Sequence, residues 1–125
     1  ISHRLSIQFL PRPPTEPTDT LVLNSGGTTN FFTDFRPLRE DPSKCEWAFA
    51  GVKRYLDDGR CQWDHLVDNR AVESGIEMLP DIGRCETMED GSEVERGTML
   101  NPETGKVEEY VEVWKDEGVP SGSRV

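Results

Sequence analysis

The sequence has no apolar run that approaches the roughly 20 residues of a membrane-spanning helix. Basic residues are also scarce, since 14 Lys and Arg stand against 24 Asp and Glu and give a formal net charge of −10. Binding to nucleic acid phosphates or to an anionic membrane requires a cationic surface. We therefore expect neither a nucleic-acid partner nor a membrane partner for this acidic chain of 125 residues.

Cysteine and histidine are few as well. The cysteines Cys45, Cys61 and Cys85 are odd in number and form no CxxC pair, which is typical of free thiols in a reducing, cytoplasmic compartment. His3 and His65 lack a further histidine at metal-ligand spacing. Because GxSxG, phosphate-loop, HExxH and EF-hand patterns are also missing, we expect neither a metal site nor a cofactor.

Alternation of apolar and polar residues with a period of two predicts a chain made mostly of short strands. In the first strand, Leu5, Ile7 and Phe9 form the apolar face, and Arg4 lies on the opposite face. Turn sequences rich in Gly, Pro, Asn and Asp separate the segments. Strands are expected over residues 3–10, 20–24, 30–36, 45–54, 60–68, 93–100 and 106–115.

Residues 69–89 show no sustained period, and only a short helical turn over residues 71–78 is expected there. Seven or so short strands with turns between them are typical of an antiparallel sandwich or barrel. We predict a mostly all-β fold with little helix: a single β-barrel domain over residues 1–118. Residues 119–125 are interpreted as a tail or the start of a linker.

The most apolar stretch of the chain, residues 45–51, is the expected centre of the fold. Trp47 and Phe49 share one face of this strand, and we expect both to be buried. A turn leads into the following strand, so that Cys45 and Cys61 begin the two arms of a hairpin. They then lie at opposite ends of it, too far apart for a disulfide.

Four short runs give the chain a resemblance to a known family. Residues 46–51, with the sequence EWAFAG, resemble the hallmark run of the fungal HRI-type proteins, which are named for a protein-kinase interactor. Residues 61–65, 95–97 and 101–106 also resemble filamentous-fungal members. The resemblance implies a lipocalin-like or calycin-like barrel, two of which stand in tandem in larger members. It implies that this chain corresponds to one barrel, with a second barrel domain or a homodimer as its partner, and it assigns no catalytic residue.

His65, Arg96 and Glu112 are the candidate catalytic residues, because each shares a strand face with bulky side chains. His65 lies on the face of Trp63 and can act as an acid or base near neutral pH, or it is a satisfied polar residue of the barrel wall. Arg96 is expected to point inward and hold a carboxylate or enolate oxygen of a ligand. The alternative for Arg96 is a structural ion pair with Glu108 or Glu112.

The register of the last strand decides the environment of Glu112. If Tyr110 and Trp114 face inward, Glu112 is a carboxylate among aromatic rings, and a shift by one residue would expose it. The residues expected to contact a ligand are Trp47, Phe49, Trp63, Tyr110 and Trp114.

Two functions fit these observations. The first is binding of a small apolar or aromatic metabolite inside the barrel, with an acid–base isomerase or cyclase of fungal metabolism as its catalytic form. The second is a non-catalytic protein-interaction module with a packed core, whose acidic strands and residues 36–44 contact a basic partner. A pocket that reaches His65 or Arg96 favours the first function, and a filled barrel favours the second.

Overall fold

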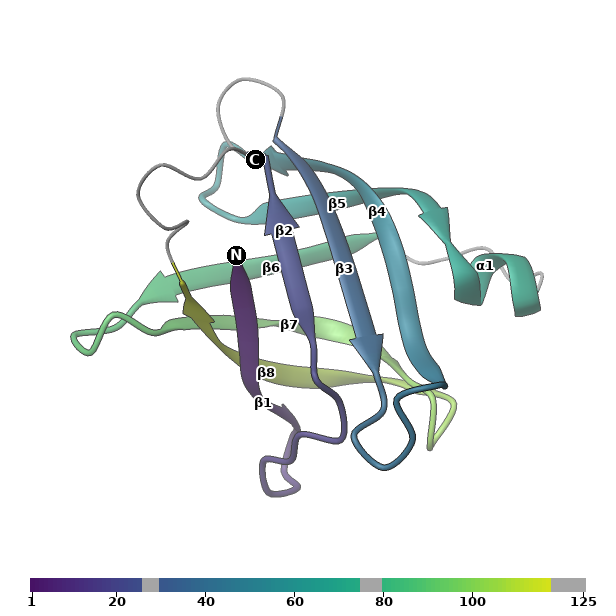
Figure 1. Cartoon of the computed structure of the whole chain (residues 1–125). Coiled ribbons are helices and arrows are strands. Elements are labelled where there is room, and N and C mark those ends of the chain that lie inside the picture. Colours follow the sequence, from purple (N-terminus) through teal and green to yellow (C-terminus); the bar gives the residue numbers. More distant parts are fainter. Residues whose placement is uncertain (26–29, 75–79, 118–125) are drawn as a thin grey trace.

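The computed structural model describes residues 1–25, 30–74 and 80–117, which form a barrel of antiparallel strands (Figure 1). Each strand pairs with its neighbours in the chain, and the first strand pairs with the last, so the sheet closes on itself. This confirms the predicted antiparallel β-barrel. The strands are β1 (Ser2–Phe9), β2 (Leu21–Asn24), β3 (Phe31–Pro37), β4 (Cys45–Tyr55), β5 (Cys61–Asp68), β6 (Asp81–Thr87), β7 (Glu93–Asn101) and β8 (Lys106–Asp116).

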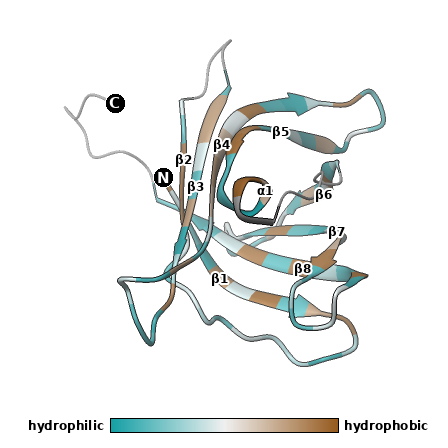
Figure 2. Ribbon diagram, turned by 90° about the vertical axis from the view of Figure 1, so that its right-hand side faces the viewer, coloured by the Kyte–Doolittle hydropathy of each residue, from teal (hydrophilic) through white to brown (hydrophobic). Residues whose placement is uncertain are grey.

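A short helix, α1 (Asn69–Ser74), joins β5 to the segment before β6. It lies across one end of the barrel, where Figure 2 shows it end-on inside the ring of strands. The helical turn expected over residues 71–78 therefore begins slightly earlier. The rest of that segment, residues 75–79, and the expected tail, residues 119–125, lie outside the described residues. None of the described helical structure is long and apolar enough to cross a membrane.

Strand β6 is the element that the sequence did not predict. Its inward position Gly83 carries no side chain, so the segment shows no apolar alternation. Gly83 pairs with Gly97 of β7, and Gly97 pairs with Tyr110 of β8. A Cβ atom on Gly97 would lie 3.0 Å from the Tyr110 ring and 2.7 Å from the carbonyl oxygen of Ile82. The Tyr110 side chain thus covers the inner surface of two neighbouring strands, which explains why both inward positions are glycine.

The predicted hairpin of β4 and β5 is present and carries much of the core. Trp47 and Phe49 are buried, as predicted, and form an apolar cluster with Phe32 of β3. Cys61 pairs with Tyr55 at the opposite end of β4 from Cys45. All three cysteines are free, which confirms that prediction.

A β-bulge in β5 changes which of its side chains face the interior. Gly51 pairs with His65 while Ala50 pairs with Val67, so Leu66 is an extra residue. Leu66 and Val67 are both exposed as a result. The expectation that Val67 shares the inner face of His65 is therefore wrong, and Asp68 takes the inward position instead.

A second register shift lies in β1, between Arg4 and Ser6. Leu5 is exposed and Arg4 is buried, the reverse of the arrangement that alternation predicted. Ile7 remains buried, as expected. The shift places the Arg4 guanidinium inside the barrel.

Candidate ligand-binding site

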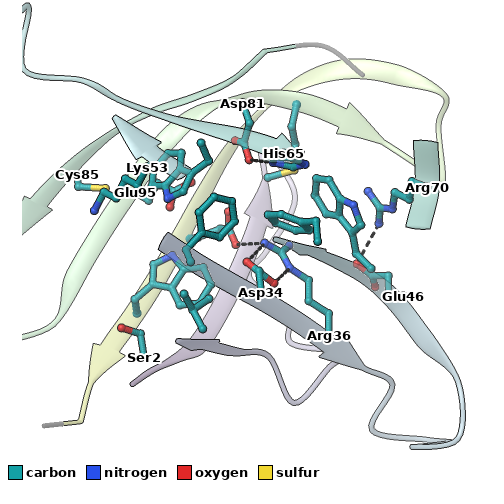
Figure 3. Close-up of a pocket in the computed structure, with 18 of the residues that line it drawn as sticks. Ser2, Asp34, Arg36, Glu46, Lys53, His65, Arg70, Asp81, Cys85 and Glu95 are labelled. Carbon is teal, nitrogen blue, oxygen red and sulfur yellow. Dashed lines mark hydrogen bonds and ion pairs between the residues drawn. The ribbon is translucent and has the colours of Figure 1, made fainter. Parts of the chain in front are cut away.

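The barrel encloses a cavity of about 620 Å³. Figure 3 shows its wall, in which charged side chains alternate with aromatic rings. His65, Trp47, Phe49, Trp63 and Trp114 line the cavity, as the sequence predicted. The predicted contact residue Tyr110 is buried, but it lies behind the lining, against the two glycines described above. Sequence reasoning missed Phe32, which also lines the cavity.

The aromatic side of the cavity is a continuous stack built from β3, β4 and β5. The Phe49 ring lies parallel to the His65 ring, with centroids 4.1 Å apart. Trp47 lies 4.3 Å from Phe49 on the same strand, and the edge of Phe32 meets Phe49 at 5.8 Å. The Arg36 guanidinium lies 5.0 Å from the Trp47 ring and 5.4 Å from the Phe49 ring. This wall can hold flat apolar rings, because offset and edge contacts between rings are favourable.

His65 is held by a carboxylate at each ring nitrogen. Its Nδ1 atom lies 2.6 Å from Asp68 and its Nε2 atom 2.7 Å from Asp81. Burial lowers the pKa of His65, but the hydrogen bonds to Asp81 and Asp68 outweigh burial and raise the pKa above its ordinary value. When His65 is protonated, its two nitrogens donate one hydrogen bond to each carboxylate. Trp47 Nε1 donates to the other oxygen of Asp68 at 2.9 Å, which fixes the carboxylate in place.

A buried ion network centred on Arg4 adjoins the aromatic wall at Arg36. Its guanidinium donates two hydrogen bonds to Glu16, at 2.8 and 3.0 Å, and one to Glu112 at 2.9 Å. The Thr18 hydroxyl accepts a further bond at 3.1 Å. Burial raises the pKa of Glu16, but its bonds to Arg4 prevail and lower it. Through Arg4, the network fixes Glu16 of the loop between β1 and β2 to Glu112 on the inner face of β8.

Arg36 extends this network along β3. Its guanidinium bonds both oxygens of Asp34, at 2.8 and 3.0 Å, and lies 3.8 Å from Glu112. Glu112 faces inward together with Tyr110, so the inward register is the correct one. Glu112 nevertheless contacts two guanidinium groups rather than aromatic rings alone, and this position is typical of a structural ion pair.

Glu95 is the carboxylate that sequence reasoning missed. It is 8% exposed, lines the cavity, and accepts a hydrogen bond of 2.5 Å from the Tyr110 hydroxyl. Burial raises the pKa of Glu95 well above its ordinary value, and the nearby carboxylates of Glu112 and Asp81 raise it further. A carboxyl group of this kind keeps its proton to a higher pH than an exposed glutamate, and in the protonated form it can donate a hydrogen bond.

The prediction that Arg96 points inward is wrong. Arg96 is exposed and does not line the cavity. Glu93 and Glu95 of β7 line the cavity in its place, while Val94, which was predicted on the same face as Arg96, is buried and Leu100 also lines the cavity. The inner wall of β7 is polar because it borders a cavity, so the rule that apolar side chains point inward selects the wrong face. Counting back along β7 in steps of two from the buried Asn101 reaches Glu95 and Glu93, which is the correct inward face.

The two ends of the cavity differ in their charged groups. Lys53, Glu95 and Cys85 lie together on one side, and Arg70 and Glu46 lie on the opposite side (Figure 3). The Lys53 ammonium lies 5.6 Å from the centre of the Trp63 ring. Arg70 forms an ion pair of 3.4 Å with Glu46. Within residues 1–25, 30–74 and 80–117, no group of three or more His, Cys, Asp or Glu side chains is placed to hold a metal ion.

Comparisons with known proteins agree with the barrel. The crystal structure of the uncharacterised protein YLR301w from Saccharomyces cerevisiae matches with a TM-score of 0.69 and 22% identity, covering 90% of this chain and 51% of that one. The chain thus spans about half the length of the yeast protein, and the likeness shows the fold alone. A search of curated proteins found no match. The family model described as Protein HRI1 matches residues 1–124, which confirms the resemblance: the chain belongs to the HRI1 family.

Proposed function

We propose that the barrel binds a small, flat apolar or aromatic metabolite in its interior. The observation that carries this proposal is the cavity of about 620 Å³ with an aromatic wall. Cavities that hold small molecules in proteins are typically about 300–1,000 Å³ and combine apolar walls with a few polar groups. The aromatic rings that line the cavity supply the apolar surface, and polar groups such as His65 and Arg36 lie among them.

The arrangement supports binding more strongly than catalysis. His65 would have to release Asp81 or Asp68 before it could exchange a proton with a ligand. Glu112 is held between two guanidinium groups, and Arg96 lies outside the cavity. The alternative function, an interaction module with a packed core, requires a filled interior, which does not agree with the cavity.

Fluorescence titration with 1-aminoanthracene, which is neutral near pH 7, tests the proposal. We expect the probe to bind and brighten as it enters the barrel. Trp63→Ala should weaken binding about tenfold, because it removes one ring of the wall. Tyr55→Ala serves as the matched control on the same hairpin, since Tyr55 is exposed and does not line the cavity.

Thermal melting of each variant separates loss of binding from loss of folding. Native mass spectrometry of protein purified from its own host would identify a retained ligand. Saturable binding that Trp63→Ala weakens supports the proposal. No binding, or equal affinity in a folded Trp63→Ala variant, would contradict it.

A further inference from the structure

Carboxylates outnumber cations in the buried ion network on one side of the cavity. Three carboxylates, those of Glu16, Asp34 and Glu112, face the two guanidinium groups of Arg4 and Arg36. The side chains of all five residues are at most 6% exposed. Bulk water therefore screens their charge poorly, and this network carries one uncompensated negative charge.

Carboxylates also outnumber cations around His65. The single imidazolium of His65 lies between two carboxylates, those of Asp68 and Asp81. Asp81 also lines the cavity, where its side chain is 25% exposed. At the helical end, Arg70 and Glu46 form an ion pair and add no net charge. The described walls are thus more negative than their own cations can neutralise.

Glu95 is a further buried carboxyl group in the lining of the same cavity. The Tyr110 hydroxyl behind it donates a hydrogen bond to it, and no ion pair among the described residues involves Glu95. Burial and neighbouring carboxylates raise the pKa of Glu95, which favours its protonated form. A positive charge brought into the cavity would reverse this preference and ionise Glu95.

The protein's own cations lie over several of the aromatic rings. Arg36 and Arg70 lie over the Trp47 ring, at 5.0 and 4.1 Å from its centroid. The Phe49 ring lies between His65 and Arg36. The faces of these two rings are already occupied by side chains.

Three further rings line the cavity. They belong to Phe32, Trp63 and Trp114. Trp114 pairs with Glu93 across β7 and β8, two residues along β7 from Glu95. Lys53 lies 5.6 Å from the centroid of the Trp63 ring, with Glu93 as a nearby counter-charge, and the edge of Phe32 meets Phe49. Aromatic rings beside an uncompensated carboxylate are the arrangement that binds organic cations in proteins.

We propose that the ligand carries a positive charge: a flat organic cation, such as a protonated amine, that packs against Phe32, Trp63 and Trp114 with Glu95 as its counter-ion. This inference rests on the proposed function, because it concerns the ligand of the same cavity. It differs from the expectation that Arg96 holds a carboxylate. An anionic ligand would add to the negative charge of the walls and is disfavoured.

Three probes that share one anthracene ring test the charge preference. They are 9-(aminomethyl)anthracene, which is cationic near pH 7, 9-anthracenemethanol, which is neutral, and 9-anthracenecarboxylate, which is anionic. Fluorescence anisotropy with the wild-type chain should give the tightest binding for the ammonium probe, about tenfold tighter than for the alcohol. The carboxylate probe should bind most weakly.

Two variants assign the preference to Glu95. Glu95→Gln removes the ionisable group and should reduce the ammonium preference to about threefold or less, with the affinity for the alcohol unchanged. Glu109→Gln, on the exposed face of β8, makes the same chemical change outside the barrel and should alter neither affinity. Thermal melting establishes that each variant is folded.

The pH dependence gives an independent readout. Because a bound cation favours ionised Glu95, the affinity of the ammonium probe should rise with pH until Glu95 is ionised in the free protein as well, and Glu95→Gln should flatten this rise. The groups that face Glu95 from neighbouring elements, and that could add to the effect, are Glu112 and Tyr110 of β8, Asp81 and Cys85 of β6, Arg36 of β3 and Lys53 of β4.

The outcomes separate this inference from the proposal on which it rests. If the alcohol binds as tightly as the ammonium, or the carboxylate binds more tightly, the charge preference is refuted while ligand binding stands. An ammonium preference that persists in folded Glu95→Gln refutes Glu95 as the counter-ion. If none of the three probes binds, ligand binding itself is overturned, and the inference with it.

Discussion

Replacement of Arg4 should strongly destabilise the barrel. Its side chain is completely buried and gives two hydrogen bonds to Glu16 and one to Glu112. Arg4→Met keeps much of the aliphatic volume but leaves Glu16 without its guanidinium partner. Breaking a buried ion pair by removing one partner typically costs about 3–5 kcal/mol, and we expect a loss of this size in the free energy of unfolding.

Glu112→Gln provides a graded comparison within the same network. After this change Arg4 keeps both bonds to Glu16, and Arg36 keeps both bonds to Asp34. The loss is limited to one charge-assisted hydrogen bond and a weaker contact at 3.8 Å, so a cost of about 1.5–3 kcal/mol follows. Arg4→Met should therefore be the more damaging of the two variants.

Urea unfolding followed by tryptophan fluorescence measures both effects. With a slope of about 2 kcal/mol per molar urea, Arg4→Met should lower the midpoint by roughly 2 M and Glu112→Gln by roughly 1 M. Arg12→Met is the control, because Arg12 pairs with Glu108 at the exposed surface and should shift the midpoint little. A midpoint for Arg4→Met equal to that of Arg12→Met would refute the structural role of the network.

Three further outcomes are expected. Because the pKa of His65 is raised in the folded state, its contribution to stability is complete below the unfolded pKa of about 6.5 and is lost as the pH rises through the folded pKa. Urea midpoints should therefore fall with rising pH more steeply in the wild type than in His65→Gln. Parallel curves for the two proteins would contradict this. Trp47→Ala should cost about 3–5 kcal/mol in unfolding experiments, and an unchanged midpoint would show that Trp47 is not a core residue. Maleimide labelling of the denatured, unreduced chain should count three thiols, since all three cysteines are free; a lower count would reveal a disulfide.

Several lining residues of the candidate site could be predicted from residue patterns. Trp47 and Trp63 are bulky members of alternating strands, so their inward positions followed from local sequence. His65 followed from the same alternation. Glu95 could not be found in this way, because the inner wall of β7 is polar and the apolar residues of that strand suggested the opposite face, with Arg96 inward.

The amino-acid sequence by itself determined the fold class, because strands of period two and turns rich in Gly, Pro, Asn and Asp are local properties of the chain. Only the tertiary structure decided which polar groups meet inside the barrel. One extra residue in β5 turns Asp68 inward beside His65, and a register shift in β1 turns Arg4 inward toward Glu112. These shifts depend on how each strand pairs with its neighbours when the sheet closes, and the alternation within a single strand does not contain that information.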